Sequence, residues 1–213
     1  MRQVLLINKD PDMHSDLNSL FQENNYESVI LDEVETGNEA LRKVVNDSYD
    51  MLILNLDLPN TNMLGLINKL RLLNQDLPIL IYSLELEYIF IKRYLTSGVN
   101  GYCFFKNGDV GEILDAAVRI STGKWYISQE MVELIVEKAL YSKKIDRFDN
   151  LDEQEFEILT HLIKGDTVAN IAKIMGVHLP TVSVYKTRIL DKLRITSLLE
   201  LKNIIKIPLL SES

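Results

Sequence analysis

Residues at or just past the ends of apolar runs are the first candidates for a chemical site. They are Asn8, Lys9, Asn55, Ser83, Phe105 and Lys106. If these runs are parallel strands of one sheet, their ends line a single crevice at its carboxyl edge. The set contains amides, lysines, a hydroxyl and an aromatic ring, but no carboxylate. A hard divalent cation prefers oxygen anions as ligands, so we predict no metal at this edge.

No arrangement of residues in the sequence predicts catalysis. It contains no nucleophile paired with a base, no glycine-rich phosphate loop and no cluster of metal-ligating residues. The single cysteine, Cys103, excludes an intramolecular disulfide and suits a reducing cytoplasm. No apolar run approaches the roughly 18 residues of a membrane span. We therefore expect a cytoplasmic protein that is not an enzyme, needs no cofactor and does not contact a membrane.

The charge of the chain is unevenly distributed. Residues 1–140 hold 12 Lys and Arg against 21 Asp and Glu, whereas residues 151–213 hold 8 of each. Within 177–194, four basic residues face only Asp191. A basic stripe on a protein of net charge -8 predicts that a polyanion binds at one small face rather than over the whole surface.

Short apolar runs alternate with longer amphipathic stretches over the first two-thirds of the chain, which is typical of a parallel sheet covered by helices on both faces. The predicted strands are Gln3–Ile7, Ser28–Asp32, Met51–Leu54, Ile79–Tyr82 and Gly101–Phe105. The predicted helices are Met13–Asn24, Gly37–Val45, Met63–Leu72, Glu87–Thr96 and Val110–Thr122. The fold class expected for residues 1–124 is therefore α/β, a doubly wound five-stranded parallel sheet.

The rest of the chain is helical in pattern. Residues 125–150 are expected to form a linker helix, Gln129–Leu140, and a polar linker, Tyr141–Asn150. Residues 151–213 are expected to form a small all-α domain. At its centre, Gly176 separates a helix at Val168–Met175 from one at Pro180–Leu193, which indicates a helix-turn-helix.

Together these patterns resemble a two-domain bacterial response regulator of the NarL/FixJ family, over residues 3–205. In that family the first strand ends in an acidic pair shortly before a proline, and the matching residues before Asp10-Pro11 are Asn8 and Lys9. The family's phosphoacceptor aspartate falls on Asn55, and its Ser or Thr falls on Ser83.

The lysine of the family site is displaced. It usually comes three residues after the tyrosine of the last strand, and that spacing from Tyr102 gives Phe105, with Lys106 one residue later. Because side chains alternate between the two faces of a strand, an offset of one residue turns Lys106 away unless a bulge intervenes. We favour Phe105 at the lysine position, and which of the two residues occupies it stays open.

The resemblance implies a degenerate phosphorylation pocket. An intact site binds a divalent cation through three carboxylates, one of which accepts the phosphoryl group. Here Asn8, Lys9 and Asn55 remove three negative charges and add a positive one, and an amide forms no acyl phosphate. We therefore predict a receiver that is not phosphorylated at the usual place. The pocket is either a filled, inert core or a positive, amide-lined cleft for a small anion.

The second half resembles a LuxR-type helix-turn-helix domain, in which Gln154 replaces the usual arginine of the opening segment 151–155. Val182, Tyr185, Ile189 and Leu193 recur at helical spacing and predict a buried stripe on the second helix. Lys and Arg on its other side can neutralise phosphates or contact guanine. The expected contacts to double-stranded DNA are Thr181, Ser183, Val184, Lys186, Thr187, Arg188 and Lys192.

The final predicted helix, Thr196–Lys206, is more apolar than a small helical core requires. The family dimerises through this helix, so a homodimer is expected, with Leu198, Leu199, Leu201 and Ile205 at its interface. The expected function is a sequence-specific transcription regulator that acts without aspartyl phosphorylation. Two alternatives stay open: a regulator gated by a small ligand or a regulatory protein at the altered pocket or at Tyr88–Tyr94, and an interaction adaptor that no longer binds DNA.

Overall fold

The computed structural model describes residues 2–26, 28–84, 88–105, 108–141 and 147–205, and helix residues 88–89, 138–141 and 202–205 by their backbone alone. The chain divides into two compact units, Met1–Ala139 and Leu140–Ser213. Within the described residues, no helix is both long enough and apolar enough to cross a membrane.

The first unit is a parallel sheet with the strand order β2-β1-β3-β4-β5-β6. Its strands are β1 (Gln3–Ile7), β2 (Ile30–Val34), β3 (Met51–Asn55), β4 (Ile79–Ser83), β5 (Gly101–Phe104) and β6 (Tyr126–Ile127). Its helices are α1 (Met13–Glu23), α2 (Gly37–Asn46), α3 (Met63–Leu73), α4 (Tyr88–Thr96), α5 (Val110–Ser121) and α6 (Gln129–Tyr141). The predicted α/β class with a parallel sheet is confirmed.

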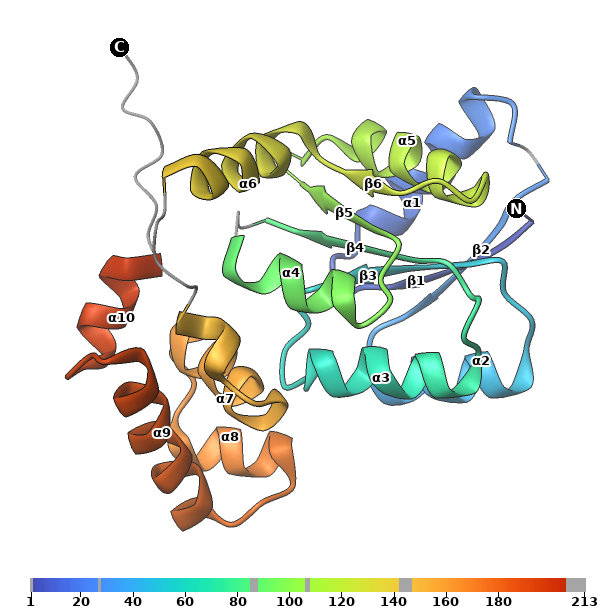
Figure 1. The fold of residues 1–213 in the computed structure, drawn as a ribbon. Helices are drawn as coiled ribbons and strands as arrows, with labels where there is room; N and C mark the ends of the chain where they lie inside the picture. Colours follow the sequence, from blue (N-terminus) through green and yellow to red (C-terminus); the bar gives the residue numbers. More distant parts are fainter. Residues whose placement is uncertain (1, 27, 85–87, 106–107, 142–146, 206–213) are drawn as a thin grey trace. The chain divides into compact units, whose positions relative to one another are not determined.

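Helices cover the sheet on both faces. Helices α1 and α5 pack together on one face, and α2 and α3 pack together on the other (Figure 1). All five residues of β4 and the first four of β3 are buried, as expected for central strands that are covered twice. Leu, Ile and Val side chains of the sheet form the core with Phe21 of α1 and Ile113 of α5.

The register brings the predicted site residues to one edge. Ile7 lies opposite Leu54, Asn55 lies opposite Tyr82, and Ser83 lies opposite Phe104. Asn8, Asn55 and Ser83 therefore leave three neighbouring strands at the same carboxyl edge. This is the edge at which a ligand site of such a sheet is expected.

Two strand predictions need correction. The second strand begins at Ile30 rather than Ser28, because a turn precedes it in which the N–H of Val29 donates to the carbonyl of Tyr26 at 2.9 Å. The sheet also has a sixth strand, β6, which pairs with β5 and which the sequence analysis missed. At two residues, β6 is too short to show an alternating pattern.

The second unit contains α7 (Glu153–Lys164), α8 (Val168–Met175), α9 (Leu179–Leu193) and α10 (Leu198–Ile205), after a short 3-10 helix at Arg147–Asn150. A capping box between Asp152 and Glu155 begins α7, and Gly165 ends it in the left-handed region at φ 88°. Gly176 ends α8 in the same way at φ 65°. The predicted helix-turn-helix is confirmed.

Candidate receiver pocket and nucleic-acid interface

A neutral hydrogen-bond network lies at the carboxyl edge of the sheet. The Oδ1 atom of Asn8 accepts from the hydroxyl of Tyr82 at 2.8 Å and from Nδ2 of Asn55 at 3.2 Å. The Nδ2 atom of Asn8 donates to the carbonyl of Asp10 at 2.7 Å and faces Oε1 of Glu33 at 3.4 Å. The two amides therefore bind each other at this edge.

The side-chain oxygen of Asn55 also has a hydrogen-bond donor. Oδ1 of Asn55 accepts from the backbone N–H of Asp57 at 2.7 Å. Asn8 is fully buried, and Asn55 is half-buried. Both polar atoms of each amide thus have partners inside the protein, so the buried polar groups carry no desolvation penalty for lost hydrogen bonds.

The sequence analysis missed Tyr82 as a pocket residue. Its ring is 1% exposed and contacts the ring of Phe105 edge-on, with centroids 5.7 Å apart. Burial raises the pKa of the Tyr82 hydroxyl, which keeps it protonated and able to donate. The apolar run that ends at Tyr82 indicated a core strand, but nothing in the sequence showed that its hydroxyl would reach the residue after β1.

The remaining pocket residues divide between core and surface. Phe105 is buried against the α1 and α5 side of the sheet, Ser83 is buried and Lys9 is exposed. Lys106 lies outside the described residues. The Ser83 hydroxyl and the N–H of Leu84 point to Oδ2 of Asp57, at 3.4 and 3.3 Å.

The described residues include no group of three or more His, Cys, Asp or Glu side chains arranged to hold a metal ion. The Asp57 carboxylate lies at this edge and accepts from Ser83 and Leu84.

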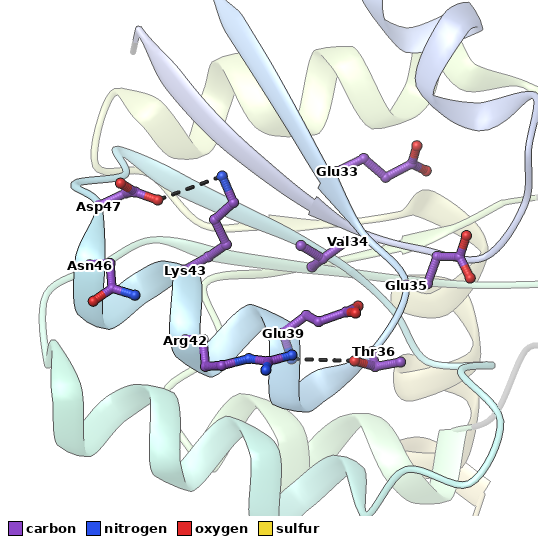
Figure 2. Close-up of a pocket in the computed structure, with 9 residues that line it drawn as sticks. All are labelled: Glu33, Val34, Glu35, Thr36, Glu39, Arg42, Lys43, Asn46 and Asp47. Atoms are coloured by element: carbon purple, nitrogen blue, oxygen red, sulfur yellow. Dashed lines mark hydrogen bonds and ion pairs between the residues drawn. The ribbon is translucent and has the colours of Figure 1, made fainter.

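A separate surface hollow of about 730 Å³ lies between β2 and α2 (Figure 2). Its charged lining residues are Glu33, Glu35, Glu39, Arg42, Lys43 and Asp47. Lys43 is already paired, at 3.2 Å from Asp32 and 3.6 Å from Asp47. Hydrogen bonding to Tyr49 lowers the pKa of Asp32, and burial raises the pKa of Tyr49 to about 12. The hollow is therefore net acidic, with four carboxylates against Arg42 and Lys43, and Lys43 is held by ion pairs with Asp32 and Asp47.

In the second unit, helix α9 presents the predicted DNA-contacting residues on one side. Ser183, Val184, Thr187 and Arg188 are exposed, and Thr181 and Lys186 are half-buried. The opposite side is buried through Val182, Ile189 and Leu193. The predicted stripe is correct at these three positions. Tyr185 departs from it, because it is half-buried and its hydroxyl donates to Gln154.

Lys192 is exposed and also binds within the unit. Its ammonium lies 2.6 Å from Oε2 of Glu155, whose side chain is 1% exposed, and 3.2 Å from the carbonyl of Asn150. The positive charge of Lys192 is therefore already compensated inside the unit. This ion pair holds the end of α9 against the start of α7. The Lys192 side chain is nevertheless 39% exposed, so its DNA contact stays a prediction beside those of Lys186 and Arg188.

Helix α10 supports only part of the predicted dimer surface. Leu199 is 71% exposed and Leu198 is half-buried. Leu201 is 1% exposed and packs inside the unit, so its prediction as an interface residue is corrected. The side chain of Ile205 lies outside the described residues.

A receiver-type sheet with a polar carboxyl edge, followed by a helix-turn-helix unit, defines a regulator with one domain for control and one for nucleic acid. Residues 4–118 match the response regulator receiver domain, and residues 149–204 match the bacterial regulatory proteins of the luxR family. The chain belongs to the response regulators with a LuxR-type DNA-binding domain. It is a DNA-binding transcriptional regulator rather than an enzyme.

Curated relatives match over nearly the full length. The DNA-binding transcriptional activator EvgA of Escherichia coli K12 is 26% identical over 198 residues, 93% of this chain and 94% of EvgA. The virulence-factor transcription regulator BvgA of Bordetella pertussis is 26% identical over 204 residues, 96% of each chain. RcsB of Salmonella enterica serovar Typhimurium, solved on promoter P1flhDC with the phosphomimetic BeF3-, shares the fold at TM-score 0.75 and 17% identity, over 96% of this chain and 98% of that one.

The Asn8 amide is predicted to be required as a neutral donor. In Asn8→Asp the introduced carboxylate loses the hydrogen bond to Asp10 and faces Glu33, so burial and repulsion raise its pKa above the unfolded value of about 3.9. We expect the free energy of unfolding to fall by about 2–4 kcal/mol at pH 7. The loss should disappear as the pH falls below the unfolded pKa, where the carboxyl is protonated in both states.

Denaturant unfolding between pH 3 and 8 tests this expectation. Asn8→Ala is the control, because it removes the same hydrogen bonds without adding a charge and its penalty should not change with pH. An Asn8→Asp protein as stable as the wild type at pH 7 would contradict the neutral network.

Lys192→Met is predicted to destabilise the second unit by about 2 kcal/mol, because it leaves the buried Glu155 carboxylate without its cation. Adding Glu155→Gln should recover most of the loss. Arg188→Met, at an exposed position of the same helix, should change stability by less than about 0.5 kcal/mol. Hydrogen exchange of α7 and α9 measures both effects. If Lys192→Met leaves exchange unchanged but weakens DNA binding, Lys192 is a DNA contact after all.

Proposed function

We propose that this chain binds specific DNA sites as a dimer and does so without aspartyl phosphorylation of its receiver domain. The observation that carries the proposal is the side chain of Asn55. It occupies the phosphoacceptor position, and its amide is bound by Asn8 and by the backbone of Asp57. An amide in this position is no nucleophile for a phosphoryl group.

Three further features of the pocket support this. Asn8 and Lys9 supply no carboxylate for a divalent cation, and the Tyr82 hydroxyl uses the same Asn8 oxygen that a cation would require. Phe105 is buried in the core and presents no ammonium. A small ligand entering the pocket would have to break the hydrogen bond between the two amides. Control of the protein by a ligand at this pocket is therefore the less supported alternative.

The DNA-binding part of the proposal rests on the exposed side of α9. Ser183, Val184, Thr187 and Arg188 are available for contacts to base edges and sugars, and Lys186 lies at the border of that side. A recognition helix of this kind inserts its amino-terminal half into the major groove. Arg188 can bind a phosphate or make a bidentate contact with guanine.

The dimer part rests on Leu199 of α10, which is 71% exposed. An exposed leucine beside the half-buried Leu198 offers apolar area to a second copy. A two-fold dimer would place two α9 helices on half-sites about one helical turn of DNA apart.

The receiver is predicted to take up no phosphoryl group. After incubation with a small-molecule phosphodonor and Mg²⁺, the intact mass should stay unchanged, because neither the metal site nor the nucleophile is present. Asn55→Asp should also remain unmodified, since Asn8 and Lys9 still supply no metal-binding carboxylate. A phosphorylated wild-type protein, with the modified residue identified by peptide mapping, would contradict this part of the proposal.

Arg188→Ala is predicted to weaken binding to a selected DNA site by about tenfold or more, since a bidentate contact to guanine contributes about 1–3 kcal/mol. Genomic fragments selected by the untreated full-length protein provide the site, and titration gives the affinity. Lys173→Ala, an exposed cation on α8, is the matched control for charge alone. Wild-type affinity in a folded Arg188→Ala protein would remove Arg188 from the interface.

A further inference from the structure

Two side chains of α9 place a cation over an aromatic ring. The Cζ atom of Arg188 lies 5.9 Å from the centroid of the Tyr185 ring, three residues earlier on the same helix. At this distance the guanidinium is attracted by the negative face of the ring. Arg188 is exposed and Tyr185 is half-buried, so the ring forms a fixed surface beneath a side chain that otherwise moves freely.

The tyrosine is itself held from a second helix. Its hydroxyl donates to Oε1 of Gln154, which lies in the first turn of α7. This hydrogen bond joins residues that are 31 positions apart in the sequence. It restricts the side-chain rotamers of Tyr185. A donating hydroxyl also shifts electron density toward the ring, which favours the cation above it.

The identity of residue 154 matters in this arrangement. The amide oxygen of Gln154 accepts the tyrosine's hydrogen, whereas an arginine has donors only. An arginine at residue 154 would bring a second positive charge to the tyrosine that supports Arg188. The neutral acceptor therefore suits a tyrosine whose ring face carries a cation.

From these contacts we infer that Gln154 and Tyr185 are positioning residues for Arg188. We name the three residues the Gln154–Tyr185–Arg188 relay. A free arginine side chain loses considerable rotamer entropy when DNA fixes it. The relay restricts the guanidinium before binding, so less entropy is lost on the DNA and affinity rises through preorganisation. The inference depends on the proposed contact between Arg188 and DNA.

Three variants separate the parts of the relay. Tyr185→Phe keeps the ring and removes the hydroxyl, and Gln154→Met keeps the length of the side chain and removes the strong acceptor. Both break the same hydrogen bond, so each should weaken binding to the selected DNA site about twofold, and the double variant should be no weaker than either. Tyr185→Leu also removes the ring face and should weaken binding about fivefold.

The decisive experiment is a double-mutant cycle with Arg188→Ala in the full-length protein, measured by titration of the selected site. The losses caused by all three variants should vanish in the Arg188→Ala background, because nothing is left to position. In a Ser183→Ala background they should persist in full, since Ser183 is exposed on the same helix and lies outside the relay. Thermal unfolding of each variant confirms that the protein is folded.

Each outcome has one meaning. If Tyr185→Leu weakens binding equally with and without Arg188, Tyr185 acts through the fold and the relay is wrong. If Arg188→Ala alone leaves affinity unchanged, the proposed DNA contact of Arg188 fails, and the relay fails with it. If the losses depend on Arg188 and Gln154→Met matches Tyr185→Phe, the positioning role is established.

Discussion

The receiver's chemistry depends on one constraint: the buried Asn8 side chain needs a hydrogen-bond partner for each of its polar atoms. Asn8 is fully buried at the carboxyl edge of the sheet, so each of its polar atoms must find a partner within the protein. Tyr82 and Asn55 donate to its oxygen, and its nitrogen donates to Asp10. In the proposed function, these bonds among Asn8, Asn55 and Tyr82 replace the carboxylates that bind a cation in the family's phosphorylation site.

The second unit follows a similar principle, because its charged groups are fixed before DNA arrives. Glu155 caps the start of α7 and binds Lys192, which joins the beginning of one helix to the end of another. With Lys192 engaged in this way, the exposed side of α9 carries few cations, and Arg188 over the Tyr185 ring is prominent among them. The proposed function joins a receiver domain that takes up no phosphoryl group to an α9 helix whose Arg188 side chain lies over the Tyr185 ring.

The sequence predicted those features that depend on local pattern. Apolar runs located the central strands, and Gly176 located the turn between two helices. The altered pocket inferred from Asn55 stays a prediction. Features that depend on contacts between distant residues were not predictable from pattern alone. The bond from Tyr82 to Asn8 spans 74 residues, and that from Lys192 to Glu155 spans 37. Strand β6 was missed because two residues carry no periodicity.

The most direct test of the central claim is the equilibrium affinity of the full-length protein for its selected DNA, before and after treatment with a phosphodonor and Mg²⁺. A neutral, closed pocket predicts the same affinity in both states, together with a specific complex formed by the untreated protein. Tight binding that appears only after treatment would contradict the account, because it would require a phosphoryl-accepting residue that the Asn8–Asn55–Tyr82 network does not provide.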